Sequence, residues 1–327
     1  MDLNIIWFVL IIVLLIGYAV LDGFVLGVGT IYLSVKGDKE RRILLRSIGP
    51  FWNGNEVWLV AGGGALFAAF PVVYASLFSG FYIPLILLLF SIIFRAIAIE
   101  FRNKEDSKLW KSFWDISLSV ASILILLLFG VAVGNLIIGL PIADDGYFRI
   151  NVFELFTPFP ILVGLLSVFF FAMHGSIYAA MKTENELQIN IVKKIKISWI
   201  IATIVYFLTA ALVQFDIIAG DLLIISGIFL LILPIFVRKN KFGVAFVISS
   251  LFAVSYIANI AFNVFPNWLL STTSSEANIN IYNGASSEYT LKIMLIIAII
   301  GVPFVLAYTI WVYSKFRGKV RLEEQKK

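Results

Sequence analysis

The feature that most constrains this sequence is a series of about nine apolar runs, each bounded by charged or turn residues. A run of about 20 such residues crosses the hydrocarbon core of a bilayer as one α-helix. Only 14% of the 327 residues are charged and 61% are hydrophobic, whereas soluble domains carry about 25% charged residues. This composition cannot cover a water-exposed surface, so the sequence predicts an all-α polytopic membrane protein.

The runs predict a single integral membrane domain over residues 1–327 with about nine transmembrane helices. The predicted spans are roughly 4–34, 54–74, 78–101, 113–139, 158–181, 195–215, 219–237, 243–265 and 291–314. The first run has no basic segment before it, so we interpret it as a retained helix and not as a secretory signal. Spans one to four and five to eight predict two four-helix bundles, with the ninth helix peripheral.

Two connections are short and two are long. Residues 70–80, FPVVYASLFSG, predict a tight hairpin turn between the second and third spans, and residues 214–221 predict another between the sixth and seventh. The connections at 140–157 and 266–290 are long enough to fold over the membrane surface. The sequence has no cysteine, which excludes disulfides, thiolate metal sites and cysteine nucleophiles.

Basic residues gather in alternate connections. Most of the 25 Lys and Arg residues lie in 36–46, 102–111, 182–196, 238–241 and 315–327. Arg149 and Lys292 fall on the other side, and Arg95 lies inside a span. Because basic loops stay in the cytoplasm, we expect the N-terminus outside and the C-terminus in the cytoplasm. The net charge of +5 is then a topology signal, and no feature predicts nucleic-acid binding.

Ionisable side chains inside apolar spans are costly, and each is a candidate functional group. Every one of them lies in the half of its span nearer the predicted cytoplasmic side. They are Asp22, Glu56, Arg95, Glu100, Asp115 and His174. A channel or symmetric transporter places polar groups through the full thickness or near the midplane. The one-sided set therefore predicts an inlet from the cytoplasm, and protons suit it because carboxylates, imidazole and water can relay them.

Each of these residues also has a structural interpretation. Asp22 is either a proton-transfer group or a buried partner of Arg95. Glu100 and Asp115 are either functional or interfacial groups at the ends of spans. His174, the single histidine, is either a haem ligand or a hydrogen-bonded packing residue.

The stretch FWNGNEVW at residues 51–58 carries polar groups into the second span. The topology places it at the cytoplasmic end of that span, where polar groups meet water. We interpret Asn55 and Trp58 as polar packing residues, and Trp52 and Trp58 also as interfacial anchors. The following AGGGALFAA at 61–69 predicts a closely packed helix face.

Several long motifs occur in a fixed order along the chain. They are LDGFVLGVG, ERRILLRSIGPFWNGNEVWLVAGGGALFAAFPVVYASLFSGFYIPL, FRAIAIEFRNK, VAVGNLIIGLP, HGSIYAAMKTE and FPNWLLSTTSSEANINIYNGASSEYTLKIM. This set resembles subunit II of cytochrome bd-type quinol oxidases. The resemblance is dense over about residues 15–185 and continues more thinly to the end of the chain.

The resemblance implies a heterodimer of two related nine-helix subunits in the plasma membrane of a prokaryote. Subunit I is expected to bind haem b558, haem b595, haem d and the membrane quinol, while subunit II binds no cofactor or metal and has no catalytic residue. The complex is expected to oxidise quinol, reduce dioxygen to water and take its protons from the cytoplasm. A structural quinone in subunit II and a small accessory membrane subunit are left open.

Two positions depart from the family's motifs. Val25 replaces the second acid of the DGFDxGxG motif, and Asn53 replaces the acid of the WDGNxVW motif. Asparagine can hold a water molecule but cannot ionise near neutral pH. The resemblance and the topology together predict a proton pathway that consists of Asp22, Asn53, Glu56, Arg95 and Glu100.

Two other functions are considered beside this one. A proton-coupled secondary transporter would have broken helices, midplane polar sites and a repeat between halves. A purely structural scaffold for a haem subunit is a third function. Only point variants that keep the haems can separate it from a proton-conducting subunit. A haem d spectrum that co-purifies with the chain separates the oxidase from the transporter.

Overall fold

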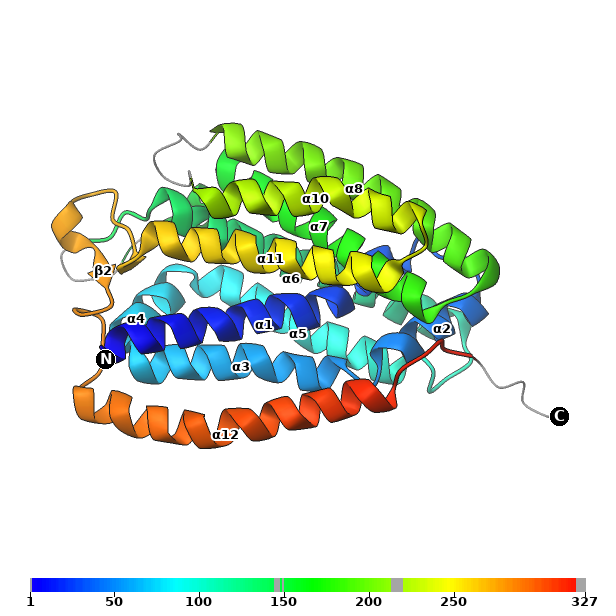
Figure 1. Ribbon diagram of the computed structural model, residues 1–327, viewed down its shortest axis with the longest axis horizontal. Coiled ribbons are helices and arrows are strands. Elements are labelled where there is room, and N and C mark those ends of the chain that lie inside the picture. The colour runs from blue at the N-terminus through cyan, green and yellow to red at the C-terminus, as the bar shows by residue number, and fades with distance from the viewer. Residues whose placement is uncertain (1, 144–147, 149, 213–219, 322–327) are drawn as a thin grey trace.

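The computed structural model describes residues 2–143, 148, 150–212 and 220–321. Its long helices run side by side, with the N-terminus, α4 and β2 at one end and α2 and the C-terminal segment at the other (Figure 1). We call the second end the basic end, because residues 36–46, 102–108, 238–241 and 315–321 lie there. The first end, with the described residues of the connections at 139–143, 150–157 and 265–287, is the loop end.

Among the residues that the structure describes, nine helices of 18 residues or more make up the fold, in agreement with the about nine spans that the sequence predicts. They are α1 (Leu3–Tyr32), α3 (Trp52–Ala69), α5 (Tyr82–Phe101), α6 (Lys108–Ile138), α7 (Pro158–Lys182), α8 (Asn185–Leu212), α10 (Asp221–Arg238), α11 (Phe242–Val264) and α12 (Glu288–Lys315). Eight of them are long and apolar enough to span a membrane alone, and the bent pair of α3 and α4 (Pro71–Gly80) is a ninth candidate. The predicted turn at 214–219, Arg149, Lys326 and Lys327 lie outside the described residues.

The helices form the two predicted bundles. In the first, α1 packs on α3 and α6, and α5 packs on α6; in the second, α7 packs on α8 and α11, and α10 packs on α11. The bundles join where α1 and α6 pack on α7, and a Cβ atom at Gly27 of α1 would lie 1.8 Å from the carbonyl oxygen of Phe171. Only glycine permits this approach. Helix α12 is peripheral, and Leu291 is its one buried residue.

The predicted tight turn at 70–80 is wrong, because this stretch forms the helix α4, bent by 118° from α3. Pro71 lacks an N–H and cannot continue α3, but its fixed φ suits the first turn of a new helix. Val73 and Ser76, three residues apart, are buried. Helix α4 therefore lies against the loop end of the bundle.

Two further differences from the predicted spans share a cause of their own, the amphipathic character of the segments. Helix α8 begins at Asn185, ten residues before the predicted span, and α2 (Asp38–Ile48) fills part of a predicted loop. Both segments are too polar for a hydropathy criterion, but both are amphipathic. Leu187, Ile191 and Ile195 are buried at four-residue intervals along α8, which is the spacing of one helix face.

The two long connections at the loop end pack against each other. The N–H of Leu140 donates to the carbonyl of Leu270, and the N–H of Thr272 donates to the carbonyl of Leu140. The short strands β1 (Asn267–Leu269) and β2 (Ile279–Asn280) pair antiparallel, and the 3-10 turns η1 (Val152–Leu155) and η2 (Ser275–Ala277) complete these segments.

At the basic end, the segment after α12 is tied to the junction of α7 and α8. Lys182 Nζ donates to the carbonyl of Phe316 at 2.6 Å, and the N–H of Val320 donates to the carbonyl of Lys182 at 2.8 Å. Arg321 forms a bidentate pair with Glu184. These contacts anchor α12 at the basic end, whereas the middle of the helix has no buried residue.

Candidate functional site

Three ionisable residues from three helices meet inside the first bundle. Arg95 Nη1 of α5 lies 2.6 Å from Asp22 Oδ2 of α1, and Arg95 Nη2 lies 2.9 Å from Glu56 Oε2 of α3. The side chains of Arg95 and Asp22 are fully buried, and that of Glu56 is 15% exposed. One guanidinium therefore faces two carboxylates within an apolar bundle. We call Asp22, Glu56 and Arg95 the buried triad.

The sequence around each member explains its placement. Leu88, Ser91, Arg95 and Ala98 are the buried residues along α5, and their spacing of three to four residues defines one face. Asp22 begins the nearly fully buried segment of α1 from residue 22 to residue 29. The predicted pairing of Asp22 with Arg95 is confirmed, and Glu56 is added to it.

Polar atoms around the triad have no hydrogen-bond partner in the described part of the chain. They are Tyr18 OH, Asp22 Oδ1, Glu56 Oε1, Trp58 Nε1 and, on Arg95, both Nε and Nη2. All six belong to α1, α3 and α5, and Arg95 Nη2 meets Glu56 as an ion pair without hydrogen-bond geometry. Since buried polar groups are costly when unpaired, and ordered water commonly pairs them, this region suits a small number of bound water molecules.

Two predicted pathway residues lie at the surface beside the triad. Asn53 and Glu100 are exposed, and Glu100 Oε1 accepts a hydrogen bond from Trp52 Nε1 at 3.2 Å. Trp52 is four residues before Glu56 on α3, and Glu100 is five residues after Arg95 on α5. Both side chains thus lie about one helical turn closer to the basic end than the triad does.

Asn55 and Trp58 of the FWNGNEVW stretch pack against α1, whereas Val57 of the same stretch is 48% exposed. Asn55 is 2% exposed; its Nδ2 donates to the carbonyl of Leu21 at 2.7 Å, and its Oδ1 accepts from Tyr313 OH at 2.9 Å. The Trp58 ring covers Gly17, where a Cβ atom would lie 2.3 Å from Trp58 Cε3. These contacts support packing roles for Asn55 and Trp58, and the interfacial roles of Trp52 and Trp58 stay predictions.

His174 is fully buried and is hydrogen-bonded through both ring nitrogens. Its Nδ1 lies 2.7 Å from Ser249 Oγ, and its Nε2 lies 3.2 Å from the carbonyl oxygen of Val20. The ring stacks on Phe246 at 4.5 Å. Of the two interpretations, this geometry supports the hydrogen-bonded packing residue, since neither nitrogen is free to ligate iron. Val25, which replaces a family acid, is 1% exposed in the apolar core.

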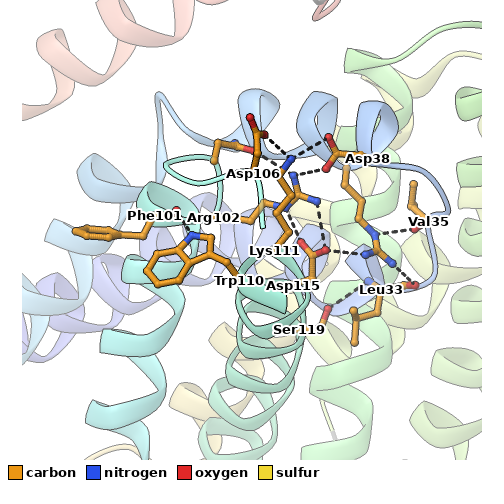
Figure 2. A network of polar contacts seen from close by, with 12 residues as sticks. Leu33, Val35, Asp38, Phe101, Arg102, Asp106, Trp110, Lys111, Asp115 and Ser119 are labelled. Atoms are coloured by element: carbon orange, nitrogen blue, oxygen red, sulfur yellow. Dashed lines mark hydrogen bonds and ion pairs between the residues drawn. The ribbon is translucent and has the colours of Figure 1, made fainter. Parts of the chain in front are cut away.

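Asp115 is the centre of a second charged network at the basic end (Figure 2). Its carboxylate accepts from Arg102 Nε at 2.7 Å and from Arg41 Nη1 at 2.7 Å. Arg102 also pairs with Asp38 at 2.8 Å, and Arg41 Nε donates to the carbonyl of Val35 at 3.0 Å. The network fastens α2 and the end of α5 to the start of α6. Asp115, 2% exposed, is thus a structural group at the end of its span.

The charge of Asp38 is favoured by this network. Partial burial would raise the pKa of its carboxyl, but the hydrogen bond and charge of Arg102 and the charges of Lys111 and Arg42 outweigh burial. The pKa of Asp38 therefore lies below its ordinary value. Lys111 continues the network to the exposed Asp106 at 2.9 Å.

Sequence reasoning missed this network and Tyr18. Arg95 and Arg102 are seven residues apart, which places them on one face of α5 two turns apart, and that spacing is the signal that could have revealed Arg102. Arg41 and Asp38 gave no such signal, because they lie in a basic loop where most charges are solvated. Within the described ranges, no group of three or more His, Asp or Glu side chains could hold a metal ion.

The chain was compared with known families and proteins. The profile of the family described as cytochrome bd terminal oxidase subunit II matches residues 3–316. Cytochrome bd-I ubiquinol oxidase subunit 2 of Escherichia coli K12 is 35% identical over 98% of this chain and 96% of that protein. Cytochrome bd ubiquinol oxidase subunit 2 of Bacillus subtilis is 33% identical over 99% of this chain and 98% of that protein.

A solved structure has the same fold. The bd oxidase from Geobacillus thermodenitrificans superposes with a TM-score of 0.77 at 17% identity, over 97% of this chain and 99% of that one. The family profile and the full-length relatives agree with this fold, with the apolar helices and with the resemblance stated from the motifs. The chain belongs to the cytochrome bd terminal oxidase subunit II family and is a multi-pass plasma-membrane subunit of an oxidoreductase complex.

Proposed function

We propose that this chain conducts protons from the cytoplasm toward a haem-binding subunit I that oxidises membrane quinol and reduces dioxygen to water. The observation that carries the proposal is the buried triad, in which Arg95 lies within 2.9 Å of carboxylate oxygens of both Asp22 and Glu56. Buried ionisable groups in membrane helices are costly and are retained where ions or protons move. Quinol oxidase activity comes to this chain from the relatives named as ubiquinol oxidase subunits.

The route begins at the basic end, which we place in the cytoplasm because basic loops stay there. Asn53 and Glu100, both exposed, form the inlet, and Asn53 contributes by holding water. Glu56 follows, since its side chain is the one partly exposed member of the triad at 15%. Asp22, completely buried, is the inner group. Water at the unpaired oxygens of Glu56 and Asp22 would bridge the steps.

The haems are assigned to subunit I. The histidine of this chain uses both ring nitrogens in hydrogen bonds to Ser249 and Val20, so its environment does not fit an axial ligand. The reduction of dioxygen is supplied by the haems of the partner, and this chain's residues hold and move protons. A small accessory membrane subunit and a structural quinone are further components that the proposal allows.

The face of α3 and α5 that carries Asn53 and Glu100 is where we place subunit I. Leu89 and Ile93 lie on the same side of α5 as Glu100 and are 56% and 42% exposed, so the face is largely apolar. A carboxylate such as Glu100 on a lipid-facing surface is unfavourable. Coverage by subunit I would remove that cost and bring the inlet and the triad next to the consumer of the protons.

The test is the purified two-subunit complex with Glu56→Gln. The Asp22–Arg95 pair remains in this variant, so we expect an unchanged haem spectrum and a fall of about tenfold or more in quinol-dependent oxygen uptake. Glu184→Gln is the matched control, because Glu184 also lies at the basic end and, among the described residues, its carboxylate pairs with Arg321 at the surface. Equal oxygen uptake by the two variants would refute proton conduction. A chain that co-purifies without haem would refute the oxidase assignment itself.

A further inference from the structure

Two consecutive carbonyl groups of α1 accept side-chain hydrogen bonds from opposite neighbours. His174 Nε2 of α7 lies 3.2 Å from the carbonyl oxygen of Val20, and Asn55 Nδ2 of α3 donates to that of Leu21 at 2.7 Å. Both side chains are buried, with exposures of 0% and 2%. The next residue along α1 is Asp22 of the triad.

Each of these bonds is supported by a second one. His174 Nδ1 lies 2.7 Å from Ser249 Oγ of α11, and Asn55 Oδ1 accepts from Tyr313 OH of α12 at 2.9 Å. The Tyr313 ring packs 4.5 Å from Phe51. A continuous line of polar contacts therefore crosses the protein from α11 through α7, α1 and α3 to α12.

The chemistry of the groups fixes the direction of the hydrogen bonds at His174. The carbonyl oxygen of Val20 can only accept, so Nε2 carries a proton. In the neutral imidazole Nδ1 is then an acceptor facing Ser249 Oγ at 2.7 Å, and the one hydroxyl proton of Ser249 is shared between Nδ1 and the carbonyl oxygen of Phe246, 2.9 Å away. His174 is thus held at both nitrogens by groups of other helices and stacks on Phe246.

The carbonyls of Val20 and Leu21 lie within α1 and also serve its own helical hydrogen bonds. Their extra bonds are therefore not needed to satisfy the backbone. Successive residues of an α-helix are about 100° apart around its axis, so the two bonds reach α1 from different directions. Together they restrain rotation and sliding of α1 at the turn that places Asp22 Oδ2 2.6 Å from Arg95 Nη1.

We propose that Asn55, His174 and Tyr313 are positioning residues that hold α1 in the register required for proton transfer at Asp22. The inference rests on the proposed proton route. Tyr313 connects the line to a helix whose one buried residue is Leu291. The seating of α12 against the bundle therefore completes the restraint on Asn55, and through Asn55 on the triad.

The experiment uses the purified oxidase complex with Asn55→Leu and His174→Phe. Leucine keeps the size of the side chain without its hydrogen bonds, and phenylalanine keeps the stack on Phe246. Asn135→Leu is the matched control, because Asn135 is a buried asparagine that donates to the carbonyls of Val131 and Leu155, far from α1 residue 22 in the loop-end half of α6.

Two readouts are measured, the pH profile of quinol-dependent oxygen uptake and the hydrogen–deuterium exchange of the α1 segment 18–26. We expect both test variants to lower oxygen uptake about three- to tenfold and to displace the pH of half-maximal rate, since small misplacement of a reacting group is costly. We expect exchange in segment 18–26 to rise by about fivefold. The control should alter neither readout.

Asp22→Asn separates the two possible failures. If Asp22→Asn slows turnover while Asn55→Leu and His174→Phe behave like Asn135→Leu, the positioning role is wrong and the proton route stands. If Asp22→Asn leaves turnover unchanged, the proton route is wrong, and the exchange of segment 18–26 then decides whether the residues position α1.

Tyr313→Phe covers the case in which a test variant does not assemble. It removes a single hydroxyl and keeps the ring against Phe51, so the haem spectrum should be retained. Its control is Tyr178→Phe, which removes a hydroxyl that donates to the carbonyl of Ser47 at 2.7 Å. A displaced pH profile in Tyr313→Phe alone supports the inference, and identical profiles in the two variants overturn it.

Discussion

Arg95 Nη1 lies 2.6 Å from Asp22 Oδ2, and neither side chain has any exposed surface. Glu56 is the second partner of Arg95 at 2.9 Å, so the three residues are not equivalent. Loss of Asp22 leaves an ion pair in place, whereas loss of Arg95 leaves two carboxylates facing each other in an apolar bundle. The difference leads to the first prediction.

Arg95→Gln should destabilise the complex by about 3–5 kcal/mol, because removal of one partner leaves buried charge uncompensated. Asp22→Asn should cost clearly less, since Arg95 keeps Glu56. Thermal unfolding of the purified complex, together with its yield from membranes, measures both. A larger loss in Asp22→Asn than in Arg95→Gln would contradict the ion-pair arrangement.

Glu100→Gln should slow quinol-dependent oxygen uptake while leaving assembly intact. We expect a loss of about three- to tenfold, below the 10²–10⁴ that a direct acid or base contributes, because Glu100 is exposed and water can partly replace it. Oxygen consumption by the purified complex is the measurement. An unchanged rate would remove Glu100 from the inlet.

Asp115→Asn should destabilise the basic end by about 3 kcal/mol, because Arg41 and Arg102 would lose the buried carboxylate they share. The matched control is Asp106→Asn, whose carboxylate is fully exposed and pairs with Lys111; it should leave stability unchanged. Thermal unfolding and limited proteolysis of α2 report the difference. Equal behaviour of the two variants would show that the network does not fasten α2.

The contribution of Asp38 should depend on pH in a defined direction. Its pKa in the folded protein is below the ordinary value of 3.8, so its ion pairs stabilise the protein above about pH 4 and lose that effect as the pH falls through the folded pKa. Because the side chain is 46% exposed, the effect should stay below about 1 kcal/mol.

Unfolding temperatures of the wild type and Asp38→Asn between pH 7 and pH 3 test this direction. The wild type should be the more stable at pH 7, and the difference should shrink as the pH falls below about 4 toward the folded pKa. A stability difference between the wild type and Asp38→Asn that grows as the pH falls would mean that folding raises the pKa of Asp38 and does not lower it.

Gly27→Ala should push α1 away from α7 and lower the stability of the contact between the two bundles. A Cβ atom there would lie 1.8 Å from the carbonyl oxygen of Phe171, which is backbone and cannot move aside; overpacking of this kind costs about 1–3 kcal/mol. Gly243→Ala is the control, because a Cβ atom at Gly243 meets nothing within 4 Å. Equal unfolding temperatures would mean that α1 and α7 can part without loss.

Local patterns of the sequence predict much of this architecture. Long apolar runs such as 158–181 specify membrane helices because each must satisfy its backbone hydrogen bonds internally in lipid, and α7 is found at Pro158–Lys182. The polar segment 185–194 is helical without a hydropathy signal, because its stability comes from the burial of Leu187 and Ile191 against other helices.

The candidate site divides in the same way. The sequence determined that Asp22, Glu56 and Arg95 are ionisable groups inside spans, and the alternation of basic loops placed them all in one half of the membrane. Only the tertiary structure decided that Arg95 reaches both carboxylates and that Glu100 stays at the surface. It also decided that Asn55 and His174 form hydrogen bonds to the carbonyls of α1 next to Asp22. The reason is physical: composition and periodicity set which segments enter the bilayer and which face is apolar, whereas helix rotation and crossing at contacts such as Gly27 with Phe171 set which side chains meet.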